Sequence, residues 1–275
     1  MIGHQQGIGL YVDSNRVFAV KLSKKFGKLG LMGYGESEYD PSADRDAADG
    51  RRVTLATAFK TVLAKLGDDS KIVAGALPGK DSILRYFEMP LIPRSEWPTA
   101  IRYEAQKYMT LNTEDLYVNF EVFRDNAKKK MRVVFLASSK DTVRKLMDSY
   151  LQAGLNLRAL EPIPLSLVRA FLQENPLKDG ENHAVIDLHN DGSINILLIK
   201  GQVLLMARDS VILKSQEGNE EIRLPDYRAL LTEINLSFSY FLKNFKSEEI
   251  KSIYLLKDAS DAFHEWEKRL SMNWA

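Results

Sequence analysis

The sequence predicts an α/β protein with two lobes and a small α+β insert, and three observations lead to this class. First, the stretches 9–22 and 184–199 share one arrangement: an apolar strand, a short polar turn and a second apolar strand that opens a new sheet. Second, residues 82–157 follow the order strand, helix, strand, strand, helix, which suffices for a small α+β subdomain. Third, a chain of 275 residues, 45% of them hydrophobic, is long enough to build a substantial core.

The first lobe is predicted from residues 1–81, joined by a return segment at 158–180. Its apolar runs are separated by turn residues, and its helix carries apolar residues at three- and four-residue spacing until Gly67 ends it. The predicted elements are strands at 8–12, 17–23, 28–34 and 71–77 and a helix at 51–66. A strand at 156–160 and a helix with Leu165, Val168 and Phe171 lead back into this lobe.

The insert is predicted from residues 82–157, with strands at 83–89, 116–122 and 131–137. Its first helix is capped by Ser95 and carries Ile101, Ala105 and Tyr108 on one face. Its second helix is capped by Ser139 and ends at Gly154. The apolar stripe predicted to face inward on that helix consists of Val143, Leu146, Met147, Tyr150 and Leu151.

The second lobe is predicted from residues 181–275, after a polar, glycine-bearing linker at 178–182. It begins with the second hairpin and continues with strands at 203–208 and 252–256. A long helix from 226 keeps one apolar face, which predicts that it packs against a sheet. That face consists of Leu230, Ile234, Phe238, Phe241 and Phe245. A last helix is predicted from Ser260, and the end at 270–275 has no stop signal, which is compatible with a longer natural chain.

Composition excludes several classes of function. The formal net charge is +1, so no overall field directs the chain to nucleic acid or to acidic lipid. The chain has no cysteine, which excludes disulfides, thiolate catalysis and cysteine–zinc sites. No apolar run approaches the roughly 20 residues that span a bilayer, and residues 1–6 lack a signal-peptide pattern, so a cytoplasmic protein is expected. The lysine run at 128–130 is predicted to be a solvated hairpin turn.

Individual motifs give little support for catalysis. The stretch 75–81 resembles a phosphate loop, but its glycine spacing is one residue short and Asp81 stands where a hydroxyl residue is required, so a turn after a strand is predicted. The four histidines are scattered, and His183 and His189 are predicted to be exposed or edge residues. No Gly-x-Ser-x-Gly elbow supports a hydrolase.

The chain resembles the PilM family, the actin-like cytoplasmic component of type IV pilus assembly, and more distantly the GspL cytoplasmic domain and FtsA. The resemblance rests on the order of the first hairpin, the run 100–108 (Ala-Ile-Arg-Tyr-Glu-Ala-Gln-Lys-Tyr), the strand 115–122 and the return segment from Leu160 to Phe171. It implies an actin-like, ribonuclease H-like fold of two lobes with a 1C-type insert at 82–157.

Nucleotide-binding residues of that family are replaced here. Where the family has an Asp, a Gly and a Lys in the first hairpin, this chain has Tyr11, Asp13 and Phe18. A carboxylate beside a phosphate turn repels the ligand, and Tyr11 cannot bind magnesium as a carboxylate does. The second hairpin keeps Asp187 but has Leu188 at a family glycine, where its bulk is expected to block close approach to the backbone. The family's Gly-Gly adenosine turn corresponds to residues 257–260, which contain no glycine.

These departures predict a pseudo-ATPase with no cofactor, whose degenerate nucleotide positions are Asn15, Glu161 and Asp187. The resemblance further implies a scaffold that binds the N-terminal cytoplasmic tail of a PilN-like membrane protein and reaches the inner membrane through that partner. The expected peptide groove involves Arg102, Tyr103, Tyr108, Arg158 and Glu161. An alternative role for Tyr103 and Tyr108 is to pack their own helix onto the sheet of the insert.

Two further hypotheses stay open. One is an active ATPase that binds ATP and magnesium through Asp187 and Glu161. The other is a GspL-like domain with GspM- or GspE-type partners, continued beyond Ala275 by a membrane span. The sequence does not distinguish a pilus from a secretion system, nor does it give the oligomeric state.

Overall fold

The computed structural model describes residues 5–13, 15–43, 53–67, 71–107, 113–189, 192–212, 227–245 and 249–257. The chain forms two compact units, each with its own hydrophobic core. Unit 1 consists of Met1–Ser82, Thr110–Val118 and Ala137–Ser166, and unit 2 consists of Ile83–Met109, Asn119–Leu136 and Leu167–Ala275. The domain boundaries predicted at 81/82, 157/158 and 180/181 stay a prediction.

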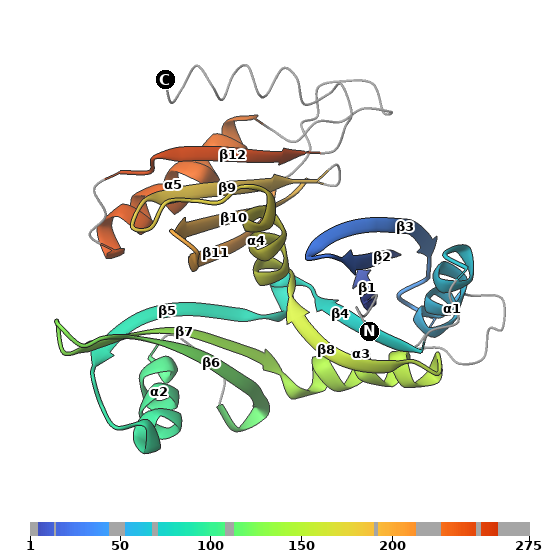
Figure 1. The fold of residues 1–275 in the computed structure, drawn as a ribbon, viewed down its shortest axis with the longest axis horizontal. Helices are drawn as coiled ribbons and strands as arrows, with labels where there is room; N and C mark the ends of the chain where they lie inside the picture. The colour runs from blue at the N-terminus through green and yellow to red at the C-terminus, as the bar shows by residue number, and fades with distance from the viewer. Residues whose placement is uncertain are drawn as a thin grey trace. The chain divides into compact units, whose positions relative to one another are not determined.

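Unit 1 is built on a five-stranded sheet with the strand order β3-β2-β1-β4-β8 (Figure 1). Its strands are β1 (Gln5–Val12), β2 (Arg16–Lys25), β3 (Lys28–Glu38), β4 (Ile72–Leu77) and β8 (Asn156–Pro162). The first three run antiparallel to one another, β4 lies parallel to β1, and β8 lies parallel to β4. Strand β1 is therefore central, and β3 and β8 are the edges.

Unit 2 contains a four-stranded sheet that repeats this topology, in the order β11-β10-β9-β12. Its strands are β9 (Asn182–Leu188), β10 (Ser193–Lys200), β11 (Val203–Val211) and β12 (Ser252–Lys257). Again three consecutive antiparallel strands are followed by a strand parallel to the first. The prediction that the two hairpins open two equivalent sheets is confirmed.

One face of the unit 1 sheet is covered by α1 (Leu55–Lys65) and α3 (Lys140–Gln152). The predicted helix at 51–66 begins later, at Leu55, because Thr54 caps it: the Thr54 hydroxyl accepts a hydrogen bond from the Thr57 backbone N–H at 3.2 Å. Helix α1 lies against β3 at Gly35, where a Cβ atom would lie 3.4 Å from Val62.

Helix α3 packs through Tyr150, whose ring stacks on Phe59 of α1 with centroids 4.4 Å apart. The inward stripe predicted for α3 is partly wrong, because Met147 and Leu151 are exposed. Ser139 occupies the N-cap position as predicted, although its side chain makes no capping hydrogen bond. The buried stripe of α3 is thus narrower than its apolar residues suggest.

The inserted segment forms a three-stranded sheet in the order β5-β7-β6 with helix α2 (Trp97–Gln106). The strands are β5 (Ile83–Pro90), β6 (Leu116–Asp125) and β7 (Lys130–Ser139), and short 3₁₀ turns occupy Gly79–Asp81, Arg94–Glu96 and Thr113–Asp115. Ile101 and Ala105 are buried, as predicted. The predicted cap at Ser95 is wrong: a 3₁₀ turn contains Ser95, and the N-cap residue is Glu96. Tyr108 lies outside the described residues.

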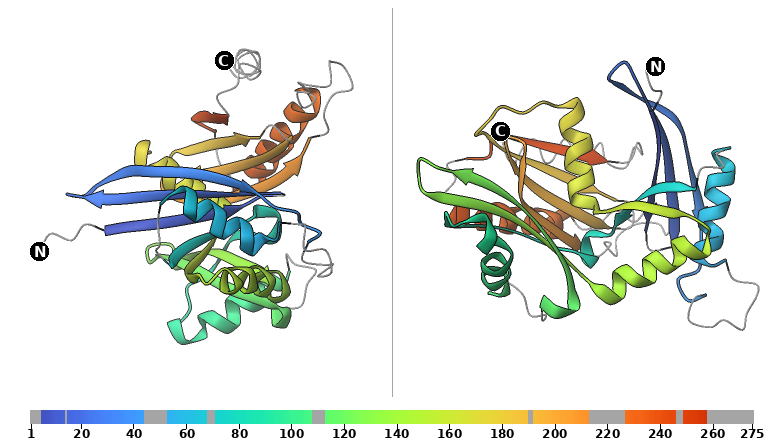
Figure 2. Two further views of the ribbon diagram at one scale, coloured as in Figure 1. Left: turned by 90° about the vertical axis from the view of Figure 1, so that its right-hand side faces the viewer. Right: turned by 60° about the horizontal axis from the view of Figure 1, so that its bottom comes forward.

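The long helix of the second lobe is α5 (Tyr227–Phe245), which lies along the four-stranded sheet (Figure 2). Its phenylalanine stripe packs in the core that this sheet forms. Leu230, Ile234 and Phe241 are fully buried there, which confirms core packing for this stripe. Tyr86 of β5 packs on the same core, with its ring 5.3 Å from that of Phe245. Helix α4 (Ile163–Glu174) follows β8, and the helix predicted from Ser260 lies outside the described residues. In the described part of the chain, no helix has the length and apolar character needed to cross a bilayer.

Candidate functional site

The end of the first hairpin carries a stacked aromatic pair. Tyr11 on β1 lies opposite Phe18 on β2, and the two rings stack with centroids 5.8 Å apart and an interplanar angle of 18°. Cross-strand partners project from the same face of a sheet. The neighbouring Leu10 and Val12 point to the opposite face, into the core with α1. The pair therefore forms a partly exposed aromatic platform on the face away from α1.

The same face carries a row of residues across the parallel strands of the sheet. Tyr11 is in register with Ala76 on β4, and Ala76 is in register with Glu161 on β8. With neighbouring strands about 4.8 Å apart, Glu161 lies roughly 10 Å from Tyr11 along this row. The Glu161 carboxylate accepts a hydrogen bond from the Ser166 hydroxyl at 2.8 Å. The carboxylate in this row is thus on the edge strand and not at the end of β1.

The turn between β1 and β2 is closed by its own backbone and by the chain after β3. The Asp13 N–H donates to the Arg16 carbonyl at 2.8 Å, and the Tyr39 N–H donates to the Asn15 carbonyl at 2.9 Å. The Tyr39 hydroxyl also donates to the Asp13 carbonyl at 3.0 Å. A phosphate cradle requires backbone N–H groups directed at the ligand. Here the Asp13 N–H is used to close the turn, and Asn15 has an exposed side chain.

The second hairpin carries a polar cluster at its end. Asp187 on β9 lies opposite Asn195 on β10, and the Asn195 side-chain amide donates to the Asp187 carboxylate at 3.4 Å. His189 Nε2 lies 2.9 Å from the same carboxylate oxygen and 3.4 Å from the Asn195 amide nitrogen. The Asp187 carboxylate is therefore held by two side chains of its own hairpin. His189 is a partly exposed residue just after β9, as expected, but sequence reasoning missed its contact with Asp187, for which the alternation of positions 187 and 189 on one strand face was the signal.

The two hairpins place these pairs at corresponding positions. Tyr11–Phe18 and Asp187–Asn195 are each the pair before the last one of their hairpin. Both turns are closed in the same way, since the His189 N–H donates to the Ser193 carbonyl at 3.0 Å. A stacked aromatic pair in unit 1 thus stands where unit 2 has a carboxylate and an amide.

Leu188 does not have the effect predicted for it. Its side chain is 2% exposed and packs in the core of unit 2, on the strand face opposite to Asp187. The expectation that its bulk blocks approach to the turn is wrong, because the side chain points away from it. Sequence reasoning also missed Gly192, whose φ of 90° lies in the left-handed region that favours glycine. The stretch that corresponds to the family's adenosine turn begins at Lys257, the last residue of β12. Its other residues, 258–260, lie outside the described residues.

Two of the residues predicted to bind the partner peptide lie on the exposed side of α2. Tyr103 is 70% exposed, and Arg102 is exposed beside it. The buried face of the helix is formed by Ile101 and Ala105 instead. The alternative in which Tyr103 packs α2 onto the insert is therefore wrong for this residue.

Two further residues predicted to bind the peptide, Arg158 and Glu161, lie on β8, an edge strand of the unit 1 sheet. The register with β4 passes from Val73–Leu157 to Ala74–Ala159, so Arg158 is an extra residue in a β-bulge, and it is exposed. Bulges commonly redirect a side chain at a sheet edge. Because Arg158 and Glu161 belong to unit 1 while α2 belongs to unit 2, a single groove formed by all of them stays a prediction.

No group of three His, Cys, Asp or Glu residues with metal-binding geometry occurs among the residues that the structure describes. His183, predicted to be an exposed or edge residue, is buried at the start of β9, an inner strand of its sheet, with its ring near Tyr254. Burial lowers the pKa of the His183 imidazole, and Glu181, 3.6 Å away, opposes this shift. This histidine is a core residue.

Comparison with solved structures finds two informative similarities. The first is the PilM-PilN type IV pilus biogenesis complex, with a TM-score of 0.72, 21% sequence identity, and coverage of 94% of this chain and 83% of the compared chain. The second is the cytoplasmic domain of EpsL, an inner membrane component of the type II secretion system of Vibrio cholerae. Its TM-score is 0.52, its identity 12%, and the coverage is 98% of this chain and 95% of the EpsL domain.

The sequence matches no protein-family model and no curated protein. The structural similarities and the duplicated sheet topology establish the fold: the chain has the two-lobed, actin-like ATPase fold with an α+β insert.

Proposed function

We propose that this chain is a non-catalytic cytoplasmic scaffold in the assembly platform of a type IV pilus or a type II secretion system. Its partner would be the cytoplasmic N-terminal tail of a PilN-like inner-membrane protein, which would also hold the scaffold at the membrane. The similarity to the PilM-PilN complex supports the nature of the machinery and of the partner. The EpsL similarity supports the same broad class of machinery.

The observation that carries the non-catalytic part of the proposal is the Tyr11–Phe18 stack. A bound Mg–nucleotide requires oxygen ligands for the metal and donors for the phosphates. A phenol and a phenyl ring supply neither a carboxylate nor a cation at the end of the first hairpin. The nearest carboxylate of the row, Glu161, accepts a hydrogen bond from Ser166.

The second hairpin supports the same conclusion for a different reason. Asp187 is the acidic position of the family pattern that the second hairpin keeps, and its carboxylate contacts His189 and Asn195. Both contacts are made to one carboxylate oxygen, Oδ2, so a metal ion at that oxygen would compete with His189. This geometry favours a hairpin stabilised within its own unit over a site prepared for a ligand.

The exposed face of α2 supports the partner-binding part. A large aromatic side chain and an arginine next to each other are the residue types that most often dominate protein interfaces. Tyr103 gives rigid contact area, and Arg102 can hydrogen-bond to backbone carbonyls or to a carboxylate. Both side chains are exposed, so binding would need no rearrangement of α2.

A peptide titration tests the partner-binding part. A synthetic peptide with the cytoplasmic N-terminal residues of the PilN-like protein of the same organism is titrated into the chain by calorimetry. We expect saturable binding, which Arg102→Ala and Tyr103→Ala each weaken by tenfold or more, since interface hot spots cost about 2 kcal/mol or more. The matched control is Tyr240→Ala, which removes an exposed tyrosine from α5. Absence of saturable binding to the unmodified chain contradicts the proposal.

Calorimetry with Mg–ATP tests the non-catalytic part. We expect no heat of binding at micromolar nucleotide. Micromolar binding that Asp187→Ala abolishes would establish the alternative, an active ATP-binding protein of the same machinery. The control is Asp125→Ala, which removes an acidic residue from the β6–β7 hairpin of the insert.

A further inference from the structure

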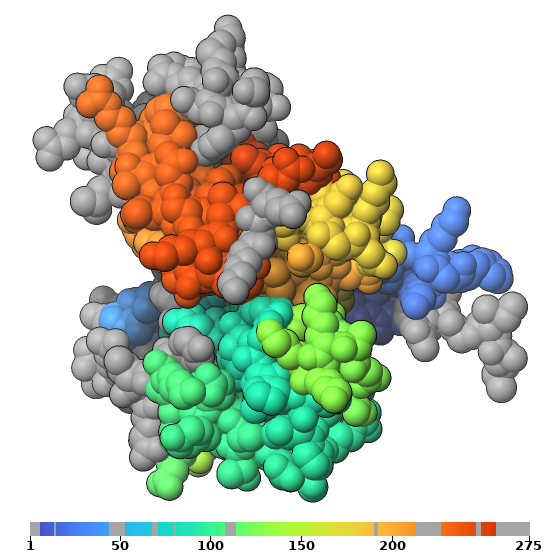
Figure 3. All heavy atoms as spheres, turned by 90° about the vertical axis from the view of Figure 1, so that its left-hand side faces the viewer, coloured from blue at the N-terminus to red at the C-terminus, as the bar shows by residue number. Residues whose placement is uncertain are grey.

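The distal half of the β2–β3 hairpin exposes a group of large apolar side chains that the fold does not use. Phe26 at its tip is 74% exposed and Leu31 is 62% exposed, with Leu29 and Met32 also exposed beside them. The hairpin is the outer part of the unit 1 sheet, and its atoms, in blue, are uncovered on the face drawn in Figure 3. Scattered single apolar residues on a surface need no explanation, but four within seven consecutive positions form a patch.

The residue at the tip of the hairpin, Phe26, is unfavourable for the folding of the turn. The two-residue turn Phe26-Gly27 has positive φ at both positions, 51° and 80°. Turns of this kind favour Asn or Gly at the first position, because a bulky side chain is strained in the left-handed region. The chain therefore has a large aromatic residue at a position where a small polar one would fold more easily. Phe26 is therefore a candidate for contact with another surface.

Three of the apolar residues, Leu22, Leu29 and Leu31, share one face of the hairpin with Lys24. Leu31 lies opposite Leu22, and Leu29 lies opposite Lys24, so these four side chains project from the same side. A bulge at Lys21/Leu22 separates this distal part from the sheet that packs on α1. The distal hairpin is thus an apolar face with a phenylalanine at its extremity.

Charge around this face is of one sign. Four lysines occur between residues 18 and 35, at positions 21, 24, 25 and 28, and this stretch contains no Asp or Glu. Lys24, Lys25 and Lys28 are exposed around the tip, and the Lys25 ammonium lies 5.8 Å from the centre of the Phe26 ring. An apolar tip ringed by lysines matches a negatively charged lipid surface, where rings enter the headgroup region and ammonium groups stay at the phosphates.

We propose that the tip of the β2–β3 hairpin inserts shallowly into an anionic bilayer, led by Phe26 and Leu31 and held at the phosphates by Lys24, Lys25 and Lys28. This contact is direct and goes beyond attachment through a membrane partner. It rests on the hairpin alone, so it does not depend on the proposed peptide binding.

The same features disfavour the other use of an exposed sheet edge, the addition of a partner strand to β3. Strand addition requires a regular, flat edge, whereas bulges and lysines are the devices that prevent it. Strand β3 has a bulge, and glycines occupy positions 30, 33 and 35. Few side chains are therefore left to recognise a partner strand. The lysines also lie where a lipid phosphate can reach them without any strand pairing.

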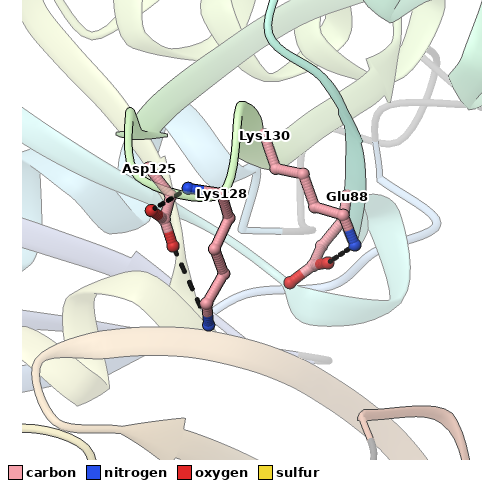
Figure 4. Close-up of polar contacts among 4 residues, drawn as sticks. All are labelled: Glu88, Asp125, Lys128 and Lys130. Atoms are coloured by element: carbon pink, nitrogen blue, oxygen red, sulfur yellow. Dashed lines mark hydrogen bonds and ion pairs between the residues drawn. The ribbon is translucent and has the colours of Figure 1, made fainter.

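A second lysine-rich turn in the same chain provides the comparison. The β6–β7 turn contains Lys128, Lys129 and Lys130, but Lys130 contacts Glu88 at 3.3 Å and Lys128 contacts Asp125 at 3.9 Å (Figure 4). This turn has no large apolar residue at its tip, where the sequence is Asn126-Ala127. Its lysines have acidic neighbours and no large apolar residue beside them, so this turn serves as the control for the vesicle experiment.

Vesicle flotation tests the proposal. The full chain is mixed with vesicles of roughly 70% phosphatidylcholine and 30% phosphatidylglycerol, and in parallel with phosphatidylcholine alone. We expect binding to the anionic vesicles only, and we expect it to weaken as salt rises. Phe26→Asn, which suits the turn and preserves folding, should weaken binding about tenfold, and Lys24→Gln with Lys25→Gln about fivefold per lysine. Lys128→Gln with Lys129→Gln should change nothing.

Several outcomes would overturn the proposal. One is absence of flotation with anionic vesicles at low salt. Another is flotation that Phe26→Asn and the Lys24/Lys25 variant leave unchanged, or equal flotation with both vesicle types. If these variants reduce binding of the PilN-like peptide and leave vesicle binding intact, the hairpin is a protein-docking surface and the lipid proposal is wrong. Loss of peptide binding alone, in Arg102→Ala, would count against the proposed function and not against this inference.

Discussion

A Cβ atom placed on Gly75 would lie 2.6 Å from the hydroxyl oxygen of Tyr150. Gly75 is on β4, and Tyr150 projects from α3 onto the sheet, stacked on Phe59. The helix therefore approaches the strand as closely as it does because the strand has no side chain at this position. The sequence motif that resembles a phosphate loop starts at this glycine, and the structure gives the glycine a packing role.

Gly75→Ala should destabilise unit 1. The added methyl group would lie 3.0 Å from Leu157 as well as against Tyr150, so both side chains must move, and overpacking of this kind costs about 1–3 kcal/mol. The measurement is the free energy of unfolding in urea. In a Tyr150→Phe background the same substitution should cost less, because the hydroxyl that meets the methyl group is gone. Equal costs in the two backgrounds would contradict this explanation.

Tyr150→Phe by itself should leave stability unchanged or raise it. The Tyr150 hydroxyl is buried and has no hydrogen-bond partner among the described residues, and burial raises the pKa of this phenol above its usual range. An unpaired buried hydroxyl costs about 1–3 kcal/mol, which the substitution removes while it keeps the ring stack on Phe59. Thermal unfolding compares the variant with the native chain. A clear loss of stability would mean that the hydroxyl has a partner.

The Tyr11–Phe18 stack should contribute a measurable coupling energy. In a double-mutant cycle with Tyr11→Leu and Phe18→Leu, we expect a coupling of about 0.5–1.5 kcal/mol in the free energy of unfolding, beyond simple burial. The control cycle combines Tyr11→Leu with Phe59→Leu on the opposite face of the sheet, and its effects should add. Zero coupling in the first cycle would mean that the two rings are not a stabilising pair.

Acid should destabilise the protein through His183. Burial lowers the pKa of this histidine in the folded state, so below its ordinary value of about 6.5 the unfolded chain takes up the proton more readily. This contribution to stability is therefore present above about pH 6.5 and is lost as the pH falls, by at most about 1.4 kcal/mol per pH unit. His183→Gln should unfold with a smaller difference between about pH 7.5 and about pH 5.5 than the native chain. Identical pH dependence in both proteins would contradict the assignment.

Most of the fold could be predicted from sequence because its signals are local. Alternating apolar residues gave the strands, and the repeated hairpin gave the duplicated topology, which the strand order confirms. The errors in the predicted core arose where an apolar stripe on a helix is only partly covered by neighbouring elements. Met147 and Leu151 continue the stripe of α3, yet they are exposed, because α3 rests on the sheet and α1 mainly through Tyr150. Periodicity gives the apolar face of a helix but not the width of its contact.

The candidate site was harder to predict because it depends on register. Alignment of the first hairpin placed Tyr11 and Phe18 at the lost nucleotide positions, but only the pairing shows that they stack. For Leu188 the expected effect was wrong, since strand alternation sends its side chain into the core. The contact between His189 and Asp187 needed the same alternation rule, applied two residues further along. Tyr103 illustrates a separate limit, because exposure on α2 depends on which neighbours the helix covers.

The inserted segment leaves unit 1 and returns to it at one place. Asp81 ends the turn after β4, Ser138 lies at the end of β7, and the Ser138 hydroxyl donates to the Asp81 carbonyl at 2.7 Å. For the host unit, residues 83–136 are therefore an excursion between β4 and α3, within which Thr110–Val118 belongs again to unit 1. Closure entropy rises only with the logarithm of loop length, so an excursion of this length costs roughly 2 kcal/mol more than a tight turn. The two stretches outside unit 1, Ile83–Met109 and Asn119–Leu136, can thus be exchanged for short loops, or for a different recognition module, without rebuilding the core of unit 1.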